Sequence, residues 1–410
     1  MRNFVTLVIL AVIGYFAFNA IWGGGDEPDS SGDGRPKISG VVPDDGNDVP
    51  NSAAILEGGS PGEIPQATPE PASSDEDEAK PVPAVGEIAN LERALSGTVS
   101  PERDADRFRL AEAYRRAGRG SDADRTFEEI YRGGGDLAPR AAVALLETSQ
   151  GSIRAELASY VVGKGPEAPG YGVAALIHGQ NLAKATEESD QMKAWRLLSE
   201  AYFSRPEESW RAPIRQVLEP LAEKWFLSRR PSSLTASYSV VGGDSLDRIA
   251  IDHGVTVDQL RIINGIEGSL IHPGDRFKVL DRPIRVEIDK SEYRLDVKYD
   301  GGFLMSFPVG HGADGRTPIA EFTVKIRQEH PDWFPPNRPR VEYGDPGNPL
   351  GERWLGFASQ DGYRGFGIHG TNQPETIGTE ASEGCVRLRN EDVIRLYPFI
   401  AVGTKVEISE

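Results

Sequence analysis

Cys385 is the single cysteine of the chain, in the segment ASEGCVRL, and His369 lies sixteen positions before it in GFGIHGTN. A thiol is only partly ionised near neutral pH, and the thiolate is the nucleophile. A histidine within hydrogen-bond reach can take the thiol proton and later return it to an entering or leaving amine. We therefore expect Cys385 and His369 to form an acyl-transfer site.

Acyl transfer also needs backbone N–H groups that hold the developing oxyanion, and Gly384 lets the loop curl so that such donors converge. The histidine needs an acceptor on its other ring nitrogen, which fixes its tautomer. The alternative is a small buried core cysteine, which the neighbouring Gly384 and the accompanying His369 disfavour. A zinc site would need further ligands, but no second cysteine exists and the histidines show no ligand spacing. No metal or cofactor is implied.

Residues 284–409, which carry these candidates, are predicted to be mainly β. Apolar and polar residues alternate in RVEIDKSEYRLDVKYDGGFLMSFPVG around Asp300, Gly301 and Gly302, which is a hairpin signal. EFTVKIRQ and the terminal TKVEIS are further strands. Regular short strands separated by turns indicate a sandwich-like β domain.

This segment resembles the catalytic domain of the L,D-transpeptidases, the YkuD family. The resemblance rests on several separate motifs in the family's usual order. They are His369-Gly370-Thr371, Ile377-Gly378, Ser382-x-Gly384-Cys385-Val386-Arg387-Leu388, Thr317-Pro318 with Phe322, the segment from His330 through Trp333 to Pro336, and Asn348-Pro349-Leu350-Gly351.

The resemblance implies that Cys385 attacks the carbonyl of the diamino acid in a peptidoglycan tetrapeptide stem. The terminal D-alanine leaves, and an amine of a neighbouring stem takes the acyl group from the thioester, which makes a 3→3 cross-link. His369 would be the base, the carbonyl of Gly370 would orient its ring, and the N–H groups of Gly384 and Cys385 would hold the oxyanion. The substrate side of the site would be formed by Arg387, Ser382, Thr371 and Trp333.

Two positions depart from the family pattern. Ala320 stands where the family usually has a glycine that helps a turn. Glu383 stands where histidine or another basic residue is common. A carboxylate close to the thiol would disfavour the thiolate, whereas a solvated one would have little effect because of screening.

Residues 237–280 form a β-α-α-β unit between the short strands YSVV and RFKVL. Ser245 or Asp244 can cap the first helix, Gly254 can end it, and Thr256 can cap the second. The unit resembles the LysM family, whose members bind N-acetylglucosamine-containing polymers such as peptidoglycan. The resemblance implies a shallow glycan groove formed by Gly243, Asp244, Ser245, Leu246, Asn264 and Ile271.

Residues 86–230 are predicted to be helical. DRFRLAEAYRRAGRGSDADRTFEEIYRGG has two apolar stripes at helical spacing around a Gly-containing turn. This looks like a single tetratricopeptide-type unit, although no clear 34-residue period follows. We expect a helical spacer or scaffold, and a partner-binding groove is the alternative.

The N-terminus is predicted to be a membrane anchor. Residues 1–22 contain an apolar run long enough to span a bilayer as a helix, with Arg2 before it and an acidic segment behind it. This predicts a single-pass membrane protein whose other domains lie on the extracytoplasmic side; a cleaved signal peptide is the alternative. Residues 23–85 hold 14 acidic and 3 basic residues and are rich in Pro, Gly and Ser, which is typical of a disordered linker. The net charge of −18 argues against a nucleic-acid partner.

The sequence therefore predicts a multidomain peptidoglycan L,D-transpeptidase that a LysM domain targets to the wall. One alternative is an L,D-carboxypeptidase that uses the same site with water as acceptor. Another is a non-catalytic peptidoglycan-binding scaffold. Attachment of a protein to the wall by the same acyl transfer is a variant of the first hypothesis.

Overall fold

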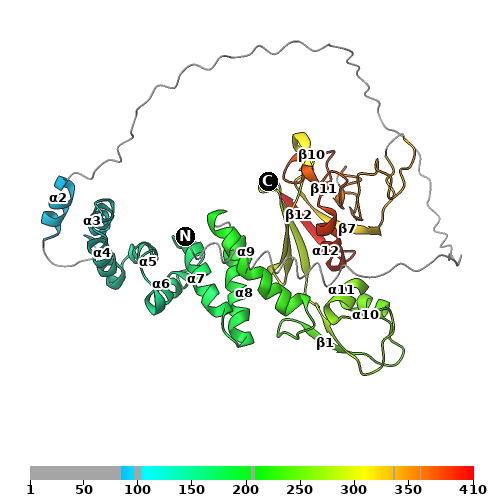
Figure 1. The fold of residues 1–410 in the computed structure, drawn as a ribbon, viewed down its shortest axis with the longest axis horizontal. Coiled ribbons are helices and arrows are strands. Elements are labelled where there is room, and N and C mark those ends of the chain that lie inside the picture. Colours follow the sequence, from blue (N-terminus) through cyan, green and yellow to red (C-terminus); the bar gives the residue numbers. More distant parts are fainter. Residues whose placement is uncertain (1–84, 97–102, 205–207, 336–337, 361) are drawn as a thin grey trace, which may run out of the picture. The chain divides into compact units, whose positions relative to one another are not determined.

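The computed structural model describes residues 85–410 except 97–102, 205–207, 336–337 and 361 (Figure 1). The predicted anchor at residues 1–22 and the linker at 23–84 lie outside the described residues. In the described part, no helix combines the length and the apolar character that a membrane crossing requires.

The described chain begins with a helical region. Its helices pack mainly on their sequence neighbours. The elements are α2 (Val85–Leu95), α3 (Asp104–Arg116), α4 (Gly120–Gly133), α5 (Ala138–Leu146), α6 (Gly151–Val162), α7 (Tyr171–Ala183), α8 (Glu188–Phe203), α9 (Glu208–Ala222) and the π-helical turn η2 (Glu223–Leu227).

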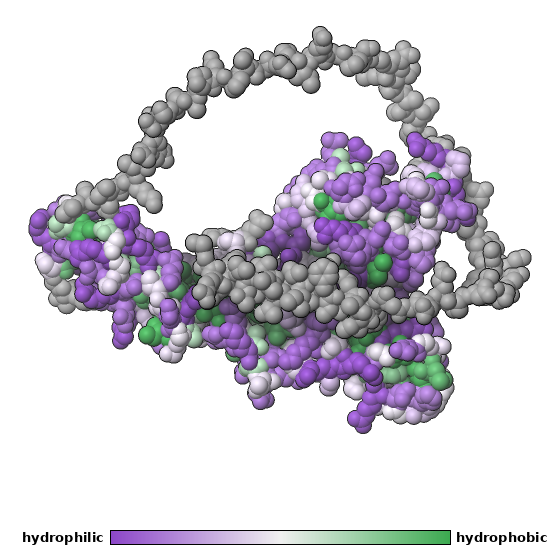
Figure 2. Space-filling view, in the orientation of Figure 1, coloured by the Kyte–Doolittle hydropathy of each residue, from purple (hydrophilic) through white to green (hydrophobic). Residues whose placement is uncertain are grey.

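The LysM unit has the predicted order of elements: β1 (Ala236–Ser239), α10 (Leu246–His253), α11 (Val257–Asn264) and β2 (Arg276–Val279). β1 and β2 pair antiparallel. Ser245 caps α10 by accepting the N–H of Arg248, and Thr256 caps α11 by accepting the N–H of Gln259. Figure 2 shows hydrophobic surface over α10, where Ile251 is 78% exposed.

The catalytic domain is built on one eight-stranded sheet in the order β11-β9-β8-β7-β12-β3-β4-β5. Its strands are β3 (Ile284–Asp289), β4 (Arg294–Tyr299), β5 (Gly302–Pro308), β7 (Ala320–Glu329), β8 (Arg353–Phe357), β9 (Gly367–His369), β11 (Val386–Arg387) and β12 (Lys405–Ser409). β6 (His311–Gly312) and β10 (Glu380–Ser382) form a separate parallel pair, and α12 (Asn390–Leu396) packs on β8. The predicted mainly-β domain is confirmed, but one curled sheet stands where a sandwich-like arrangement was expected.

The β4–β5 hairpin turns at Asp300 and Gly301, which both have positive φ, as the sequence predicts. β5 is an edge strand, and α8 and α9 pack against it. The indole Nε1 of Trp195 donates a 2.7 Å hydrogen bond to the carbonyl of Phe303, and the Phe303 N–H donates to Ser199 Oγ at 2.9 Å. The helices thus cover an edge that would otherwise expose unpaired backbone groups.

This packing joins the last helices to the catalytic domain in one hydrophobic core, which holds Trp195 and Phe226 together with Tyr299 and Phe303. A second core is made within α2–α7. The sequence predicts a spacer or scaffold for this region, and α7–α9 pack directly on the catalytic domain and share its core.

The LysM unit is also attached to its neighbours. Its buried Lys278 donates hydrogen bonds to the carbonyls of Trp225, Ser228 and Arg230, at the end of the helical region. On the other side, the Thr256 hydroxyl donates to the carbonyl of Pro398 in the catalytic domain. These contacts fix the LysM unit relative to the sheet of the catalytic domain.

Candidate active site

Parallel strand pairing brings the two candidate catalytic residues together. β11 runs beside β9 with Val386 opposite Ile368 and Arg387 opposite His369. Cys385 directly precedes β11, so the same register sets it beside Gly367 of β9. The fifteen residues between the candidates (370–384) form a connection that leaves the sheet after β9 and returns at β11.

His369 is held in one orientation. Its Nδ1 lies 2.5 Å from the carbonyl oxygen of Gly370, so Nδ1 carries the proton and Nε2 is left as the acceptor. The ring is buried and lies 5.8 Å from the Trp354 indole, centroid to centroid. Burial lowers the pKa of His369 to about 4, and the Arg387 charge acts in the same direction. The ring is therefore a neutral base in the free protein.

The turn after His369 is fixed by Asn390 at the start of α12. Its Oδ1 accepts the N–H groups of Thr371 and Glu352, and it packs so close to Gly370 that a Cβ there would lie 2.2 Å from it. Thr371 is 2% exposed, and its hydroxyl accepts the N–H of Gln373. Thr371 therefore shapes this turn, in contrast to the substrate contact that was expected of it. Asn390 was missed because the sequence around the first residue of α12 gives no sign of partners 19 and 38 positions away.

Cys385 is partly exposed, and its thiol donates to the carbonyl of Gly365 at 3.5 Å. Burial raises the pKa of the thiol to about 11, while the Gly367 backbone and the Arg387 charge oppose this shift. Glu383 also raises the pKa, but as the smallest contribution, since its side chain is exposed. Thiol and imidazole are thus both neutral at rest, and proton transfer must accompany attack on the substrate.

The loop before the nucleophile is closed by Ser382. The Ser382 hydroxyl accepts the Gly384 N–H at 3.1 Å and donates to the Cys385 carbonyl at 2.6 Å. The N–H of Gly384 was expected to hold the oxyanion, but in this structure it donates to Ser382 within the loop. Gly384 has φ of +134°, and a Cβ there would lie 2.7 Å from the Phe366 ring, so the position requires glycine.

Thr317 supports this loop from a distant part of the chain. Its hydroxyl donates to the carbonyl of Gly384 at 2.7 Å and accepts the N–H of Gly312 at 2.7 Å. The residue is 1% exposed. Its position in the Thr-Pro motif was noted in the sequence, but its contact with the nucleophile loop depends on the fold.

The Arg387 guanidinium contacts the connection between β9 and β11. Its Nη1 donates to Gln373 Oε1 at 3.3 Å and to Thr376 Oγ1 at 3.4 Å. Its Nε is buried with no hydrogen-bond partner among the described residues. Arg387 thus has donor capacity left beside the thiol, as a carboxylate-binding residue requires.

The remaining positions predicted in the catalytic domain lie away from these contacts. Trp333 belongs to the segment between β7 and β8, where its backbone pairs with that of Val341. Ala320 begins β7 and pairs with Ile408 of β12. The backbone at Ala320 is therefore an extended strand, which needs no glycine.

In the LysM unit, two predicted glycan contacts are core residues. Asn264 is 6% exposed, and its amide binds the backbone N–H and C=O of Lys278 and the carbonyl of Leu260. Leu246 is 3% exposed. Asp244 is used within its own loop, where it accepts the Tyr238 hydroxyl and the Val241 N–H.

Gly243 and Ser245 are exposed on the loop before α10, and Ile271 is half-buried on the loop before β2. With Asp244, which is also half-buried, these are the predicted glycan-binding residues that the structure leaves at the surface of the unit. The buried Asn264 and Leu246 support the two loops instead of forming the expected groove.

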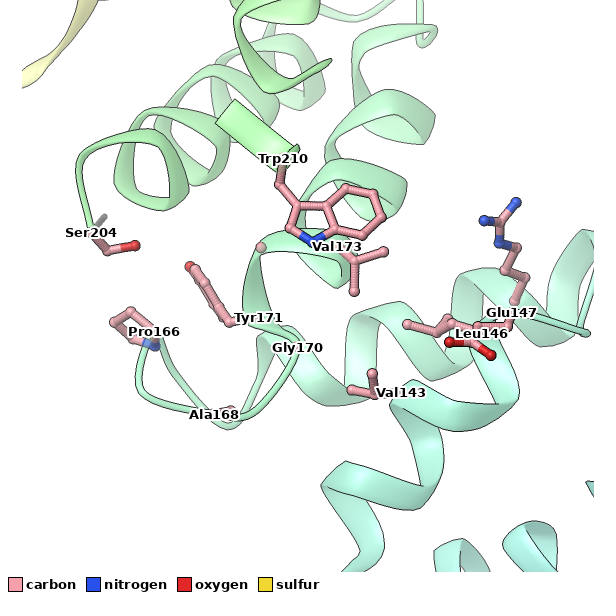
Figure 3. A pocket seen from close by; sticks show the side chains of 12 residues that line it. Val143, Leu146, Glu147, Pro166, Ala168, Gly170, Tyr171, Val173, Ser204 and Trp210 are labelled. Atoms are coloured by element: carbon pink, nitrogen blue, oxygen red, sulfur yellow. The ribbon is translucent and has the colours of Figure 1, made fainter. Parts of the chain in front are cut away.

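A cavity of about 490 Å³ lies in the helical region and has no part in the catalytic site. Figure 3 shows the rings of Tyr171 and Trp210 on one side of it and the chains of Val143 and Leu146 on another. Glu147 and Arg154 supply charge at its edge. A partner-binding role for this region stays a prediction. Among the described residues, no group of three or more His, Cys, Asp or Glu side chains could hold a metal ion.

Comparison with known proteins supports both resemblances. The family model of the L,D-transpeptidase catalytic domain (YkuD) matches residues 283–408, and that of the LysM domain matches residues 238–279. Among solved structures, the catalytic domain of an L,D-transpeptidase from E. faecium is 20% identical with a TM-score of 0.26, covering 31% of this chain and 98% of that one.

Two relatives from Bacillus subtilis (strain 168), both named as L,D-transpeptidases, are matched over most of their length. YqjB is 38% identical over 140 residues, which are 34% of this chain and 73% of YqjB. YkuD is 30% identical over 183 residues, which are 42% of this chain and 98% of YkuD. The chain therefore belongs to the L,D-transpeptidase family, with a YkuD catalytic domain and a LysM domain that precedes it.

Proposed function

We propose that this protein is a peptidoglycan L,D-transpeptidase that forms 3→3 cross-links through a thioester on Cys385. The observation that carries the proposal is the parallel pairing of β9 with β11, which sets His369 beside the strand that Cys385 precedes. The hydrogen bond from Nδ1 to the Gly370 carbonyl leaves Nε2 free to accept a proton. A cysteine and a neutral histidine are the groups that acyl transfer needs.

In the first half-reaction, Sγ of Cys385 attacks the carbonyl carbon of the diamino acid while Nε2 of His369 takes the thiol proton. The C–N bond to the terminal D-alanine then breaks, and the proton passes to the leaving amine. Because both groups are neutral at rest, the charge separation arises only once the substrate has displaced water. Arg387, with its unpartnered Nε, binds a carboxylate of the donor stem.

In the second half-reaction, an amine of a neighbouring stem attacks the thioester. The new C–N bond forms, the C–S bond breaks, and His369 carries the amine proton back to the thiolate. The Cys385 N–H is the proposed oxyanion donor. The Gly384 N–H could join it if Ser382 rotates away, since Ser382 accepts that N–H in the free protein.

The LysM unit directs this chemistry to the wall. Lys278 and Thr256 fix it to the helical region and to the catalytic domain. The Arg327 guanidinium lies 3.7 Å from Asp258 of α11, which adds a further contact. Glycan held by the loops around Gly243 and Ser245 therefore raises the concentration of stem peptides near Cys385. The apolar run at residues 4–22 would anchor the chain in the membrane, with the catalytic part on the extracytoplasmic side.

The test is incubation of the full chain with purified disaccharide-tetrapeptide, analysed by mass spectrometry beside Cys385→Ala. A cross-linked dimer that has lost one D-alanine, and that the variant does not make, supports the transpeptidase. Tripeptide alone would assign the protein as an L,D-carboxypeptidase. Unchanged substrate, from a protein that still binds peptidoglycan, would assign it as a wall-binding scaffold.

A further inference from the structure

The sheet beside Cys385 carries an apolar strip that the chemistry above does not use. The strip consists of Ile326 on β7 and Trp354 on β8, together with Gly356 and Gly367 beneath the indole. In the sheet register, Ile326 lies opposite Gly356, and Gly356 lies opposite Gly367. With strands about 4.8 Å apart, the row from Ile326 to the thiol spans roughly 14 Å.

The Trp354 indole packs over the backbone of Gly356 and Gly367. A Cβ at Gly356 would lie 2.6 Å from Nε1 of Trp354, and one at Gly367 would lie 2.8 Å from Cη2. A larger side chain at Gly356 would therefore displace the ring, and one at Gly367 would clash with the ring and, at 2.5 Å, with the carbonyl oxygen of Leu355. The register of β9 with β11 pairs Val386 with Ile368, so Cys385, one residue earlier, lies next to Gly367. The glycine under the indole is therefore the register neighbour of the nucleophile.

A β-bulge exposes the other end of the strip. Val324 pairs with Phe357 and Ile326 with Gly356, so the register shifts by one residue at Lys325. Without the shift, Val324 and Ile326 would point to the same face. With it, Val324 is 1% exposed in the core and Ile326 is 44% exposed. Bulges commonly re-aim a side chain beside an active site.

Each of these features has a cost in stability. Glycine within a strand weakens it, and an exposed isoleucine gains little from folding. A single exposed apolar residue needs no explanation, but a continuous strip that ends at a nucleophile does. Two apolar side chains are too few for a protein interface, but they are enough to contact one alkyl chain.

We infer that Trp354 and Ile326 determine acceptor specificity by seating the alkyl arm of the attacking amine. The inference rests on the proposed function, in which a diamino acid supplies that amine. When the alkyl arm of the acceptor lies on the indole, the amine at the end of that arm reaches the thioester carbonyl. The arm also displaces the water that would otherwise hydrolyse the thioester. Attack by the amine forms the C–N bond and releases Sγ; attack by water would release a free carboxylate.

The first experiment measures how the acyl-enzyme partitions in the full chain supplied with disaccharide-tetrapeptide. Trp354→Ala should lower the ratio of cross-linked dimer to tripeptide about tenfold. The ratio is the readout because the indole also packs on His369, so total D-alanine release can fall as well without affecting the comparison. Trp354→Leu, which keeps apolar bulk, should recover most of the ratio, and Ile326→Ser should lower it about threefold. An equal loss of dimer and tripeptide in every variant would overturn the inference.

A second experiment does not depend on transpeptidase activity. The thiol of Cys385 is alkylated with N-methyl-, N-propyl- and N-hexylmaleimide, and the rates are compared. The wild-type rate should rise about twofold for each added methylene, because the chain lies on the strip. In Trp354→Ala the rates should be nearly equal. If wild type and Trp354→Ala show the same dependence on chain length, the inference is overturned, whether or not either protein forms cross-links.

Discussion

The hydroxyl of Thr317 donates a 2.7 Å hydrogen bond to the carbonyl of Gly384, the residue that precedes the nucleophile. The same hydroxyl accepts the N–H of Gly312. A buried threonine thus joins the strand pair β6–β10 to the loop that presents Cys385. The orientation of the nucleophile thus depends on a side chain that lies 67 positions before Gly384 in the sequence.

Thr317→Val keeps the shape of this residue and removes both hydrogen bonds. It leaves the Gly312 N–H and the Gly384 carbonyl buried without a partner, at a cost of about 1–3 kcal/mol each. We expect a fall in kcat of about tenfold or more with little change in KM, since the nucleophile is misplaced. Thr317→Ser retains the hydroxyl and should keep both activity and melting temperature close to wild type. Equal kcat values in the valine and serine variants would contradict this role.

His369 should make stability pH-dependent below neutrality. Its pKa is about 4 in the folded protein against a reference of 6.5, so the unfolded chain binds more protons between these values. Stability should therefore fall as the pH decreases from 6.5 to 4, by roughly 3 kcal/mol from this residue alone. Urea denaturation at several pH values measures it. The difference in slope between wild type and His369→Gln isolates the residue, and parallel curves would show that the imidazole titrates normally.

The raised pKa of Cys385, about 11, predicts a slow thiol at neutral pH. The rate of alkylation by iodoacetamide should rise about tenfold per pH unit from 7 and level off near pH 11. A plateau near neutral pH would instead indicate a preformed thiolate–imidazolium pair. The mass of the single alkylated cysteine provides the readout, and Cys385→Ala gives the background.

Glu383 should have little effect on the nucleophile. Its side chain is exposed, and it makes the smallest of the contributions to the raised pKa of the thiol. We expect Glu383→Gln to increase the alkylation rate of Cys385 at pH 7 by less than about threefold. A tenfold or larger increase would mean that the carboxylate lies against the thiol in solution. The departure from the family pattern at this position is therefore compatible with catalysis.

Trp195 should connect the stability of the helical region to that of the catalytic domain. It is fully buried in the core that both regions share, and it donates a hydrogen bond to the Phe303 carbonyl of the edge strand. Trp195→Ala should destabilise both by about 3–5 kcal/mol. Circular dichroism of the helices and loss of Cys385 protection against alkylation should report one shared, lowered transition. Two separate transitions in the wild type would show that the regions fold independently.

The sequence alone determined the features that depend on local pattern. The alternating residues around Asp300 and Gly301 gave the hairpin, and the capping positions at Ser245 and Thr256 gave the LysM helices. The spacing and chemistry of His369 and Cys385 were enough to nominate an acyl-transfer site. Such signals are readable because a turn or a cap involves residues a few positions apart.

Only the tertiary structure decided which polar side chains face the substrate and which hold the scaffold. Asn264 and Thr371 were expected at binding surfaces and are buried, because packing places their backbone partners around them. Thr317 on the loop before β7, Trp354 on β8 and Asn390 in α12 contact site residues that lie 15 or more positions away along the chain. Such contacts follow from how the strands and loops pack. In a strand, a shift of one residue reverses the face that a side chain takes, as at Ile326, so no local pattern encodes them.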